Sequence, residues 1–417
     1  MDAVILAAGE GTRLRPLTST RPKPMLQVAG KPILEWDIEA LTRIGIFNKI
    51  ILVTGYRSEK IKDYFGDEFN NIKIQYIEQK EQLGTAHAIS VVSEHVNGDF
   101  LVMNGDLLIS NELIDDLIKN HKNHNPSASL SLIKVDNPSH FGVVELKNDK
   151  VISIEEKPRY PRSNLANAGI YIFSTEIFDA LKKVEKSIRA EYEITDAIDM
   201  LIHDGKNDKN MVHGFECKGL WMDIGRPWNL LDANEILLKR DNFIKPEIHD
   251  DAVIEQYTTI KGKVHIGSGT VIKSGAYVEG PCYIGNNCNI GPNCYIRAGT
   301  TLGDNVTIGN AVEIKNTIIM ANTHVGHLSY VGDSLIGNGC NFGAGTKVAN
   351  LRFDDGEIKV RVNDKFEGSG RRKFGTIFGD DVKTGINVSI MPGVSIYPDA
   401  RVEAGSVVRN TIFSKKI

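Results

Sequence analysis

The last 165 or so residues repeat every six positions, and this repeat constrains the possible folds more than any other feature. Large aliphatic residues stand at this spacing at Ile254, Ile260, Ile266, Ile272, Val278, Ile284, Ile290, Ile296, Leu302, Ile308 and Ile314. The position four residues after each is also restricted, as at Thr258 and Ala276, and glycine often follows the aliphatic residue. A short fixed period with one large and one small inward residue is typical of short strands joined by tight corners. Because the period is neither helical nor a simple strand alternation, it predicts a β-helix.

The repeat is interrupted in two ways. Its phase slips by one residue after Ile314, resumes at Ile319, and slips again before Ile336. A charged excursion then leaves the coil from about Leu351 to Gly375. Insertions in solenoids form loops on one side, often on the binding face. The slipped stretch and the excursion are therefore where we expect chemistry.

Four of the five cysteines follow the repeat rather than a metal-binding pattern. They occupy the small inward position of their hexads, at Cys282, Cys288, Cys294 and Cys340. A spacing of six does not match that of a zinc site. The pattern therefore predicts buried, reduced thiols; Cys217 fits no pattern.

Length and charge limit the class of protein. A chain of 417 residues is too long for one core, and we expect a domain over 1–235, a linker over 236–250 and a domain over 251–417. A net charge of −4 gives no reason to expect nucleic acid or an anionic membrane as a partner. The first residues lack the basic start of a signal peptide, and no apolar run approaches the ~20 residues that span a bilayer. We expect a cytoplasmic protein.

The first half alternates apolar strand-like runs with amphipathic segments. Strands are predicted at Ala3–Ala7, Lys49–Thr54, Phe100–Met103 and Ser129–Val135, and helices at Ile33–Ile44 and Glu112–His121. This alternation predicts an α/β, Rossmann-like fold with a mainly parallel sheet. Ligands of such sheets bind beyond the carboxyl ends of the strands.

A glycine-rich loop follows the first strand. Gly9 and Gly11 stand on it, and Leu14 replaces the third glycine of a dinucleotide-binding fingerprint. A Walker A loop is excluded because no GK[ST] follows. Two glycines alone indicate only a tight turn, but Arg13 and Lys23 lie on the same loop. Backbone donors combined with mobile cations suit a triphosphate.

The run from Leu6 to Met25 resembles the fingerprint of the sugar-1-phosphate nucleotidylyltransferases. Further motifs of that family follow in its order: Gln79-Lys80-Glu81-Gln82-Leu83-Gly84-Thr85-Ala86-His87-Ala88, Asn104-Gly105-Asp106, Phe141-Gly142-Val143-Val144, Glu155-Glu156-Lys157-Pro158, Asn167-Ala168-Gly169 and Trp221-Met222-Asp223-Ile224-Gly225. The resemblance covers the first 235 residues.

The resemblance implies a reaction and roles for its residues. A sugar-1-phosphate oxygen attacks the α-phosphorus of UTP or dTTP and pyrophosphate leaves, so catalysis consists of positioning and charge neutralisation. The implied residues are Arg13 and Lys23 on the triphosphate; Leu6, Ala8, Gly9, Gly11, Thr12, Gln79, Gly84 and Thr85 on the nucleotide; Gly142, Glu156, Lys157 and Asn167 on the sugar phosphate; and Asp106 and Asp223 on Mg²⁺. Carboxylates are apt ligands for this ion.

The slipped stretch of the repeat resembles a second enzyme. Gly326-His327-Leu328-Ser329-Tyr330 is similar to the catalytic segment of the bifunctional glucosamine-1-phosphate acetyltransferase/N-acetylglucosamine-1-phosphate uridylyltransferase family, whose solenoid is a left-handed β-helix. The resemblance implies His327 as general base, Arg297, Lys315, Tyr330, Asn341 and Lys373 on the acceptor, Asn350 and Ala344 on acetyl-CoA, and a homotrimer. The attacking amine must lose a proton, which suits histidine with its reference pKa of about 6.5, and cations suit the phosphate.

Two departures suit the archaeal-type branch of that family. Asp223 stands where the bacterial enzymes usually have Asn, and Asn350-Leu351 replaces their Asn-Tyr pair. We therefore expect a bifunctional enzyme. One alternative is a glucose-1-phosphate uridylyl- or thymidylyltransferase whose solenoid only assembles oligomers. The other is a non-catalytic regulatory subunit, against which the retained metal carboxylates and loop cations argue.

Overall fold

The computed structural model describes residues 1–203, 212–240 and 244–413. The chain forms two compact units, each described by itself below. The first unit comprises Met1–Glu10 and Ile33–Asp223, and the second comprises Gly11–Pro32 and Ile224–Ile417. Residues 241–243 of the expected linker, and 414–417 of the expected second domain, lie outside the described residues.

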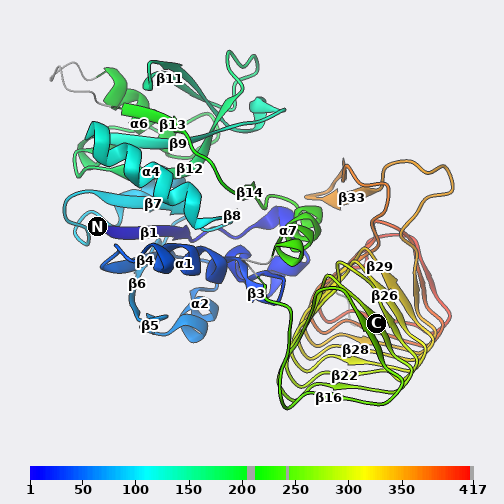
Figure 1. The fold of residues 1–417 in the computed structure, drawn as a ribbon. Helices are drawn as coiled ribbons and strands as arrows, with labels where there is room; N and C mark the ends of the chain where they lie inside the picture. Colours follow the sequence, from blue (N-terminus) through cyan, green and yellow to red (C-terminus); the bar gives the residue numbers. More distant parts are fainter. Residues whose placement is uncertain (204–211, 241–243, 414–417) are drawn as a thin grey trace. The chain divides into compact units, whose positions relative to one another are not determined.

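A ten-stranded sheet forms the centre of the first unit, in the order β10-β11-β13-β9-β12-β7-β1-β4-β6-β5 (Figure 1). The strands β7 (Phe100–Asn104), β1 (Asp2–Ala7), β4 (Lys49–Thr54) and β6 (Ile72–Glu78) run parallel. The predicted helices are present as α1 (Ile33–Ile44) and α4 (Asn111–His124), and the predicted α/β fold is confirmed. The unit also contains α2 (Ser58–Phe65), β5 (Glu68–Phe69), α3 (Thr85–Ser90), β8 (Leu107–Ile109), α5 (Ile177–Leu181), α6 (Ile194–His203), β13 (Val212–Glu216) and β14 (Trp221–Asp223).

Beyond β7 the sheet is more mixed than the alternation indicated. β12 (Leu165–Phe173) runs antiparallel to both β7 and β9 (Ala128–Lys134). β10 (Gly142–Lys147) and β11 (Lys150–Glu156) form an antiparallel hairpin. No α-helix separates β10 from β11, and a short turn can join only antiparallel neighbours.

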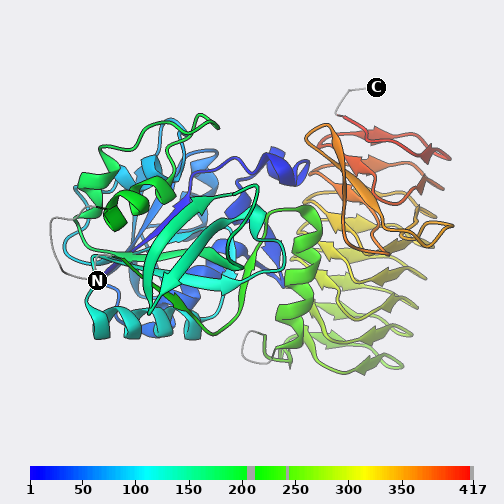
Figure 2. The same cartoon turned by 90° about the horizontal axis from the view of Figure 1, so that it is seen from above.

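Three eight-stranded parallel sheets form the solenoid of the second unit, and the predicted left-handed β-helix is confirmed (Figures 1 and 2). Each aliphatic residue pairs with the one three hexads later, so Ile254 in β16 (Val253–Ile254) pairs with Ile272. The phase slip shortens a coil by one residue, and Ile308 pairs with Val325 in β28 (His324–Val325). The stacked large side chains form one continuous buried core.

The charged excursion leaves the solenoid between β32 (Lys347–Val348) and β35 (Ile377–Phe378). It contains an antiparallel hairpin of β33 (Lys359–Val362) and β34 (Lys365–Gly368). Its ends meet at a bridge between Leu351 and Lys373. Since β30 (Leu335–Ile336) pairs directly with β35, the coil stack continues as if the excursion were absent.

The second unit also includes the loop of residues 11–32 and α7 (Pro227–Lys239). The loop contains η1 (Thr12–Leu14), η2 (Leu17–Ser19), η3 (Lys23–Met25) and a two-stranded ribbon of β2 (Gln27–Val28) and β3 (Lys31–Pro32). Within the described part of the chain, no helix has the length and apolar character needed to cross a membrane.

All five cysteines are buried and none forms a disulfide. Burial raises the pKa of Cys282, Cys294 and Cys340 to about 12 and that of Cys217 and Cys288 to about 11. Because the thiolate is the reactive form, a thiol reagent at neutral pH should modify few groups in native protein and five after denaturation. One equivalent of bound zinc, or rapid modification of the native chain, would contradict this prediction.

Candidate active sites

The two predicted metal carboxylates of the first unit lie in a turn and on the strand that pairs with the strand after that turn. The turn after β7 carries Asp106, and the preceding Gly105 donates its N–H to the carbonyl of Leu6 at the end of β1 (2.9 Å). A Cβ on Gly105 would lie 2.9 Å from that oxygen, so only glycine fits. β14 pairs antiparallel with β8, which places Asp223 opposite Leu107, the residue after Asp106. The fold therefore brings both carboxylates together beyond the carboxyl end of β7.

This donor set fits Mg²⁺. The ion takes one or two protein carboxylates, with substrate phosphates and water completing its shell. Among the described residues, no group of three or more His, Cys, Asp or Glu could hold a metal ion by itself.

Asp37 on α1 is a buried carboxyl near Asp106 that sequence reasoning did not identify. Its side chain is fully buried, and neither of its oxygens has a hydrogen-bond partner among the residues that the structure describes. Burial, and secondarily the charge of Asp106, raise the pKa of Asp37 well above its usual range. The one sequence signal was a carboxylate among the apolar positions of α1.

The predicted nucleobase loop is closed on itself. The amide of Gln79 donates to the carbonyl of Gly84 (3.2 Å). Gly84 has a φ of +111°, and a Cβ there would lie 2.5 Å from the carbonyl oxygen of Tyr192. The hydroxyl of Thr85 accepts from the N–H of Ile194 (3.1 Å). These contacts hold the loop against residues 192–194 and hold the side chain of Gln79 at Gly84.

The predicted sugar-phosphate residues of the first unit also gather together. Gly142 pairs with Glu156 across the β10–β11 hairpin, and a Cβ on Gly142 would lie 3.2 Å from that carboxylate and 3.5 Å from the Cβ of Asn167. Lys157 approaches Glu156 at 3.4 Å. Arg189, which the sequence did not identify, also contacts Glu156 (3.1 Å). Lys157 and Arg189 thus flank the carboxylate of Glu156, which can accept hydrogen bonds from hydroxyl groups.

The remaining predicted triphosphate residues lie on the loop of the second unit. Gly11 has a φ of +67°, and a Cβ there would lie 2.8 Å from the Cβ of Lys23. The hydroxyl of Thr18 donates to the carbonyl of Gly11 (2.9 Å), which closes the loop. Thr12 and Arg13 begin η1, and Arg13 is exposed, whereas Lys23 is buried at the start of η3.

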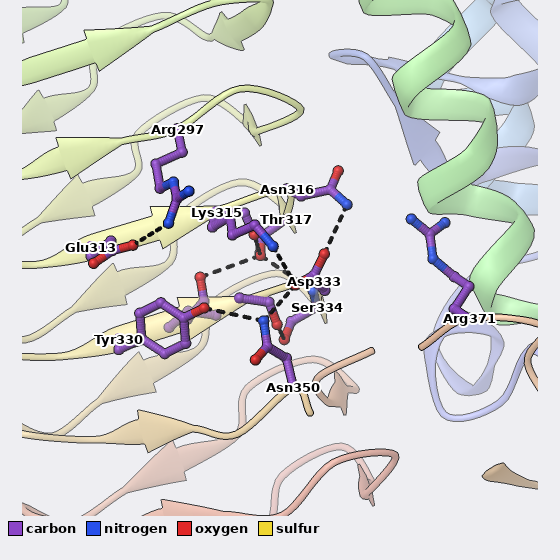
Figure 3. A network of polar contacts seen from close by, with 12 residues as sticks. Arg297, Glu313, Lys315, Asn316, Thr317, Tyr330, Asp333, Ser334, Asn350 and Arg371 are labelled. Carbon is purple, nitrogen blue, oxygen red and sulfur yellow. Dashed lines mark hydrogen bonds and ion pairs between the residues drawn. The ribbon is translucent and has the colours of Figure 1, made fainter. Parts of the chain in front are cut away.

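Four predicted acceptor and cofactor residues of the solenoid lie on strands of one sheet or just beyond them (Figure 3). Arg297 and Lys315 lie next to each other on successive coils, because Ile296 pairs with Ile314. Arg297 donates to Glu313 (2.9 Å). Tyr330, on β29 (Tyr330–Gly332), accepts from the amide of Asn350 (3.1 Å). Burial, and secondarily the charge of Asp333, raise the pKa of Tyr330.

Asp333 organises these side chains, and sequence reasoning assigned it no role. It is buried and accepts hydrogen bonds from Lys315 (3.2 Å), Asn316 (3.0 Å) and Asn350 (2.5 Å) (Figure 3). Its signal was an aspartate directly after the slipped strand Tyr330–Gly332. One buried carboxylate thus fixes both a predicted phosphate-binding lysine and a predicted cofactor-binding asparagine.

The other predicted residues of the solenoid lie at a corner, on the excursion and on a second sheet. His327 is exposed at the corner between β28 and β29, and its carbonyl accepts from the N–H of Gly345, beside Ala344 on the next coil (2.9 Å). Lys373 is exposed where the excursion returns, and Phe374 donates its N–H to the carbonyl of Asn350 (3.0 Å). Asn341 lies on β31 (Asn341–Phe342), in a different sheet from Lys315.

Asp333→Ala should lower kcat/KM for the amino-sugar acceptor on the order of tenfold to a hundredfold, because Lys315 and Asn350 lose their common acceptor. Kinetics of CoA release and a thermal melt measure this effect. Asp304→Ala is the matched control, since Asp304 also accepts hydrogen bonds at a solenoid corner, from Asn286, but lies outside the network. Equal loss of activity in both variants would contradict a role for Asp333 in the acceptor site.

Family models match both parts of the chain. The nucleotidyl transferase model matches residues 2–240, the bacterial transferase hexapeptide model residues 245–280, and the GMPPB C-terminal domain model residues 278–402. The UDP-glucose pyrophosphorylase of Acinetobacter baumanii has the same fold as the first part, with a TM-score of 0.51 and 23% identity over 58% of this chain and 95% of that one.

Relatives match nearly the whole chain. The "bifunctional protein GlmU" of Methanococcus maripaludis is 46% identical over 99% of this chain and 95% of its own length. The "bifunctional sugar-1-phosphate nucleotidylyltransferase/acetyltransferase" of Sulfurisphaera tokodaii is 44% identical over 99% and 98%. The chain therefore belongs to the family of bifunctional sugar-1-phosphate nucleotidylyltransferase/acetyltransferases, and it is both a nucleotidyltransferase and an N-acetyltransferase.

Proposed function

We propose that the enzyme acetylates glucosamine-1-phosphate with acetyl-CoA on the solenoid. It then couples the product to UTP or dTTP, releasing pyrophosphate and forming a nucleotide sugar such as UDP-N-acetylglucosamine. The observation that carries this proposal is the adjacent pair Arg297 and Lys315, held by Glu313 and Asp333 respectively. The same chain carries the carboxylates Asp106 and Asp223.

On the solenoid, Arg297, Lys315 and Lys373 bind the acceptor phosphate, and Tyr330 and Asn341 hold the sugar. His327 accepts the proton that the amine loses as it attacks the thioester, and Asn350 and Ala344 contact acetyl-CoA. The exposed positions of His327 and Lys373, at the corner and on the excursion, support these roles. So does the buried carboxylate that fixes Lys315 and Asn350.

For nucleotidyl transfer, Asp106 and Asp223 hold Mg²⁺, which neutralises phosphate charge when bound. Gln79, Gly84 and Thr85 bind the base, and Leu6, Ala8, Gly9, Gly11 and Thr12 line the nucleotide. Arg13 and Lys23 bind the triphosphate, and Gly142, Glu156, Lys157 and Asn167 bind the sugar phosphate. The closed base loop and the clustering around Glu156 support this assignment.

We propose functional domains over 1–235 and 251–417 with a linker over 236–250, which the limits of the family models at 240 and 245 support.

The proposed partners are small molecules, namely UTP or dTTP, the sugar-1-phosphate and acetyl-CoA. Neither nucleic acid nor a membrane is a proposed partner, and the proposed location is the cytoplasm.

The chain should form a homotrimer, because a repeat array presents long faces that can bury against copies of themselves under cyclic symmetry. Light scattering of the full chain should give three times its mass of 46.0 kDa. A mass equal to that of one chain would rule out self-assembly at the concentration measured.

An assay of the full chain with glucosamine-1-phosphate, acetyl-CoA, UTP and Mg²⁺ tests the proposal, with CoA and pyrophosphate followed separately. CoA should appear without UTP, and pyrophosphate should follow only when a sugar-1-phosphate and a nucleoside triphosphate are both present. Pyrophosphate release without CoA release from any amino-sugar-1-phosphate would instead establish a nucleotidyltransferase whose solenoid is a scaffold.

A further inference from the structure

Arg21 attaches the loop of residues 11–32 to the solenoid. It stands two residues before Lys23 and is 8% exposed. Its guanidinium forms an ion pair with Asp380, which is equally buried, across 359 positions of sequence. The neighbouring Thr20 donates its hydroxyl to the same carboxylate (2.6 Å).

The contact extends over three successive coils. Arg21 also approaches the sulfur of Met320 (3.0 Å) and the amide oxygen of Asn338 (3.4 Å). Met320, Asn338 and Asp380 follow the neighbouring strands β27 (Ile318–Ile319), β30 and β35. Asp380 itself accepts a hydrogen bond from the N–H of Asn338 (2.8 Å). A contact within the solenoid therefore holds its carboxylate in addition to the contacts with the loop.

The same loop is attached again beyond Lys23. Ala29 donates its N–H to the amide oxygen of Asn234 (2.9 Å), on α7. Asn234 is fully buried and in turn donates to the carbonyl of Gly299 in the solenoid (2.8 Å). A Cβ on Gly30 would lie 2.4 Å from the ring of Tyr283. Residues on both sides of Lys23 are therefore fixed to the solenoid.

We propose that Asp380 is a positioning residue for nucleotidyl transfer, acting through Arg21 on the loop that carries Arg13 and Lys23. The inference rests on the proposed role of that loop in binding the triphosphate. A loop held in its binding conformation loses less entropy when ligand binds, whereas a small displacement of a catalytic group is costly. The acetyltransferase solenoid thus sets the affinity of the other active site for its nucleotide.

Asp380→Ala tests this inference in the full chain. The KM for UTP should rise and kcat/KM for pyrophosphate release should fall about 10–100-fold, while CoA release from acetyl-CoA stays at the wild-type rate. Asp381→Ala is the matched control, because it removes the adjacent exposed aspartate from the same corner. Arg21→Lys should recover part of the affinity that Arg21→Met loses, since lysine keeps the charge but not the planar fork.

The outcomes separate this inference from the proposed function. If Lys23→Ala abolishes pyrophosphate release while Asp380→Ala has wild-type KM and kcat, the inference is wrong and the role of the loop stands. If Lys23→Ala changes nothing, the role of the loop is wrong. Should Asp380→Ala fail to fold, Asp380→Asn keeps the side-chain shape without its charge. A wild-type KM for UTP in that folded variant would likewise overturn the inference.

Discussion

Alanine in place of Asp106 or Asp223 is expected to abolish pyrophosphate release and to leave CoA release nearly intact. Asp223 lies on β14, and Asp106 lies in the turn before β8, the strand with which β14 pairs. Removal of either leaves one of the two proposed protein ligands for Mg²⁺, and phosphoryl transfer depends on neutralisation of phosphate charge. Acetyl transfer has no such need, because its proposed residues lie on the solenoid. Steady-state assays of both products in each variant measure the split.

Asp115→Ala is the matched control for these variants. Asp115 is an exposed aspartate on α4 of the same unit, so its loss changes net charge without altering the proposed metal ligands. Excess EDTA should reproduce the effect of the substitutions in the wild-type enzyme, with pyrophosphate release lost and CoA release retained. Nucleotidyl transfer at the wild-type rate in EDTA would show that Asp106 and Asp223 do not act through a metal.

The solenoid was predictable because its determinants are local. Each coil pairs with the next through the same inward residues, so a count of six is enough to place Ile254 over Ile272. The slip and the excursion were visible as breaks in that count, and both are present in the fold. The limits of helix α1 were predicted correctly for a similar reason, because its amphipathic pattern depends only on residues close to one another in the sequence.

Long-range pairing was not predictable. The direction of β12 depends on its partners β7 and β9, which the alternation of elements does not specify. The attachment of the loop of residues 11–32 to the solenoid includes the ion pair of Arg21 with Asp380, and an ion pair across 359 positions has no sequence signature.

The candidate sites divide in the same way. Motifs supplied the residues expected to contact substrate, such as Lys315 and Asn350. The residues that hold them, such as Asp333, were missed because their role exists only through their partners. Asp37 was missed for a related reason, since only the fold shows that its carboxyl is buried near Asp106.

His327→Ala is expected to lower the rate of acetylation about 10²–10⁴-fold, the contribution typical of a general base. His327 is exposed at a solenoid corner, so the substitution removes no core contact, and its backbone carbonyl still accepts from Gly345. Transfer of the nucleotidyl group to a sugar phosphate that is already acetylated should not change.

His324→Ala is the matched control for His327→Ala. His324 is an exposed histidine on β28, three residues earlier on the same coil, so both variants lose one imidazole from the same stretch. Only His327→Ala should slow CoA release, and His324→Ala should release CoA at the wild-type rate. Wild-type acetylation by His327→Ala would mean that another group accepts the proton. Absence of acetylation by the wild type on every amino-sugar-1-phosphate would instead leave the exposed corner, Arg297, Lys315 and Asp333 as parts of a scaffold.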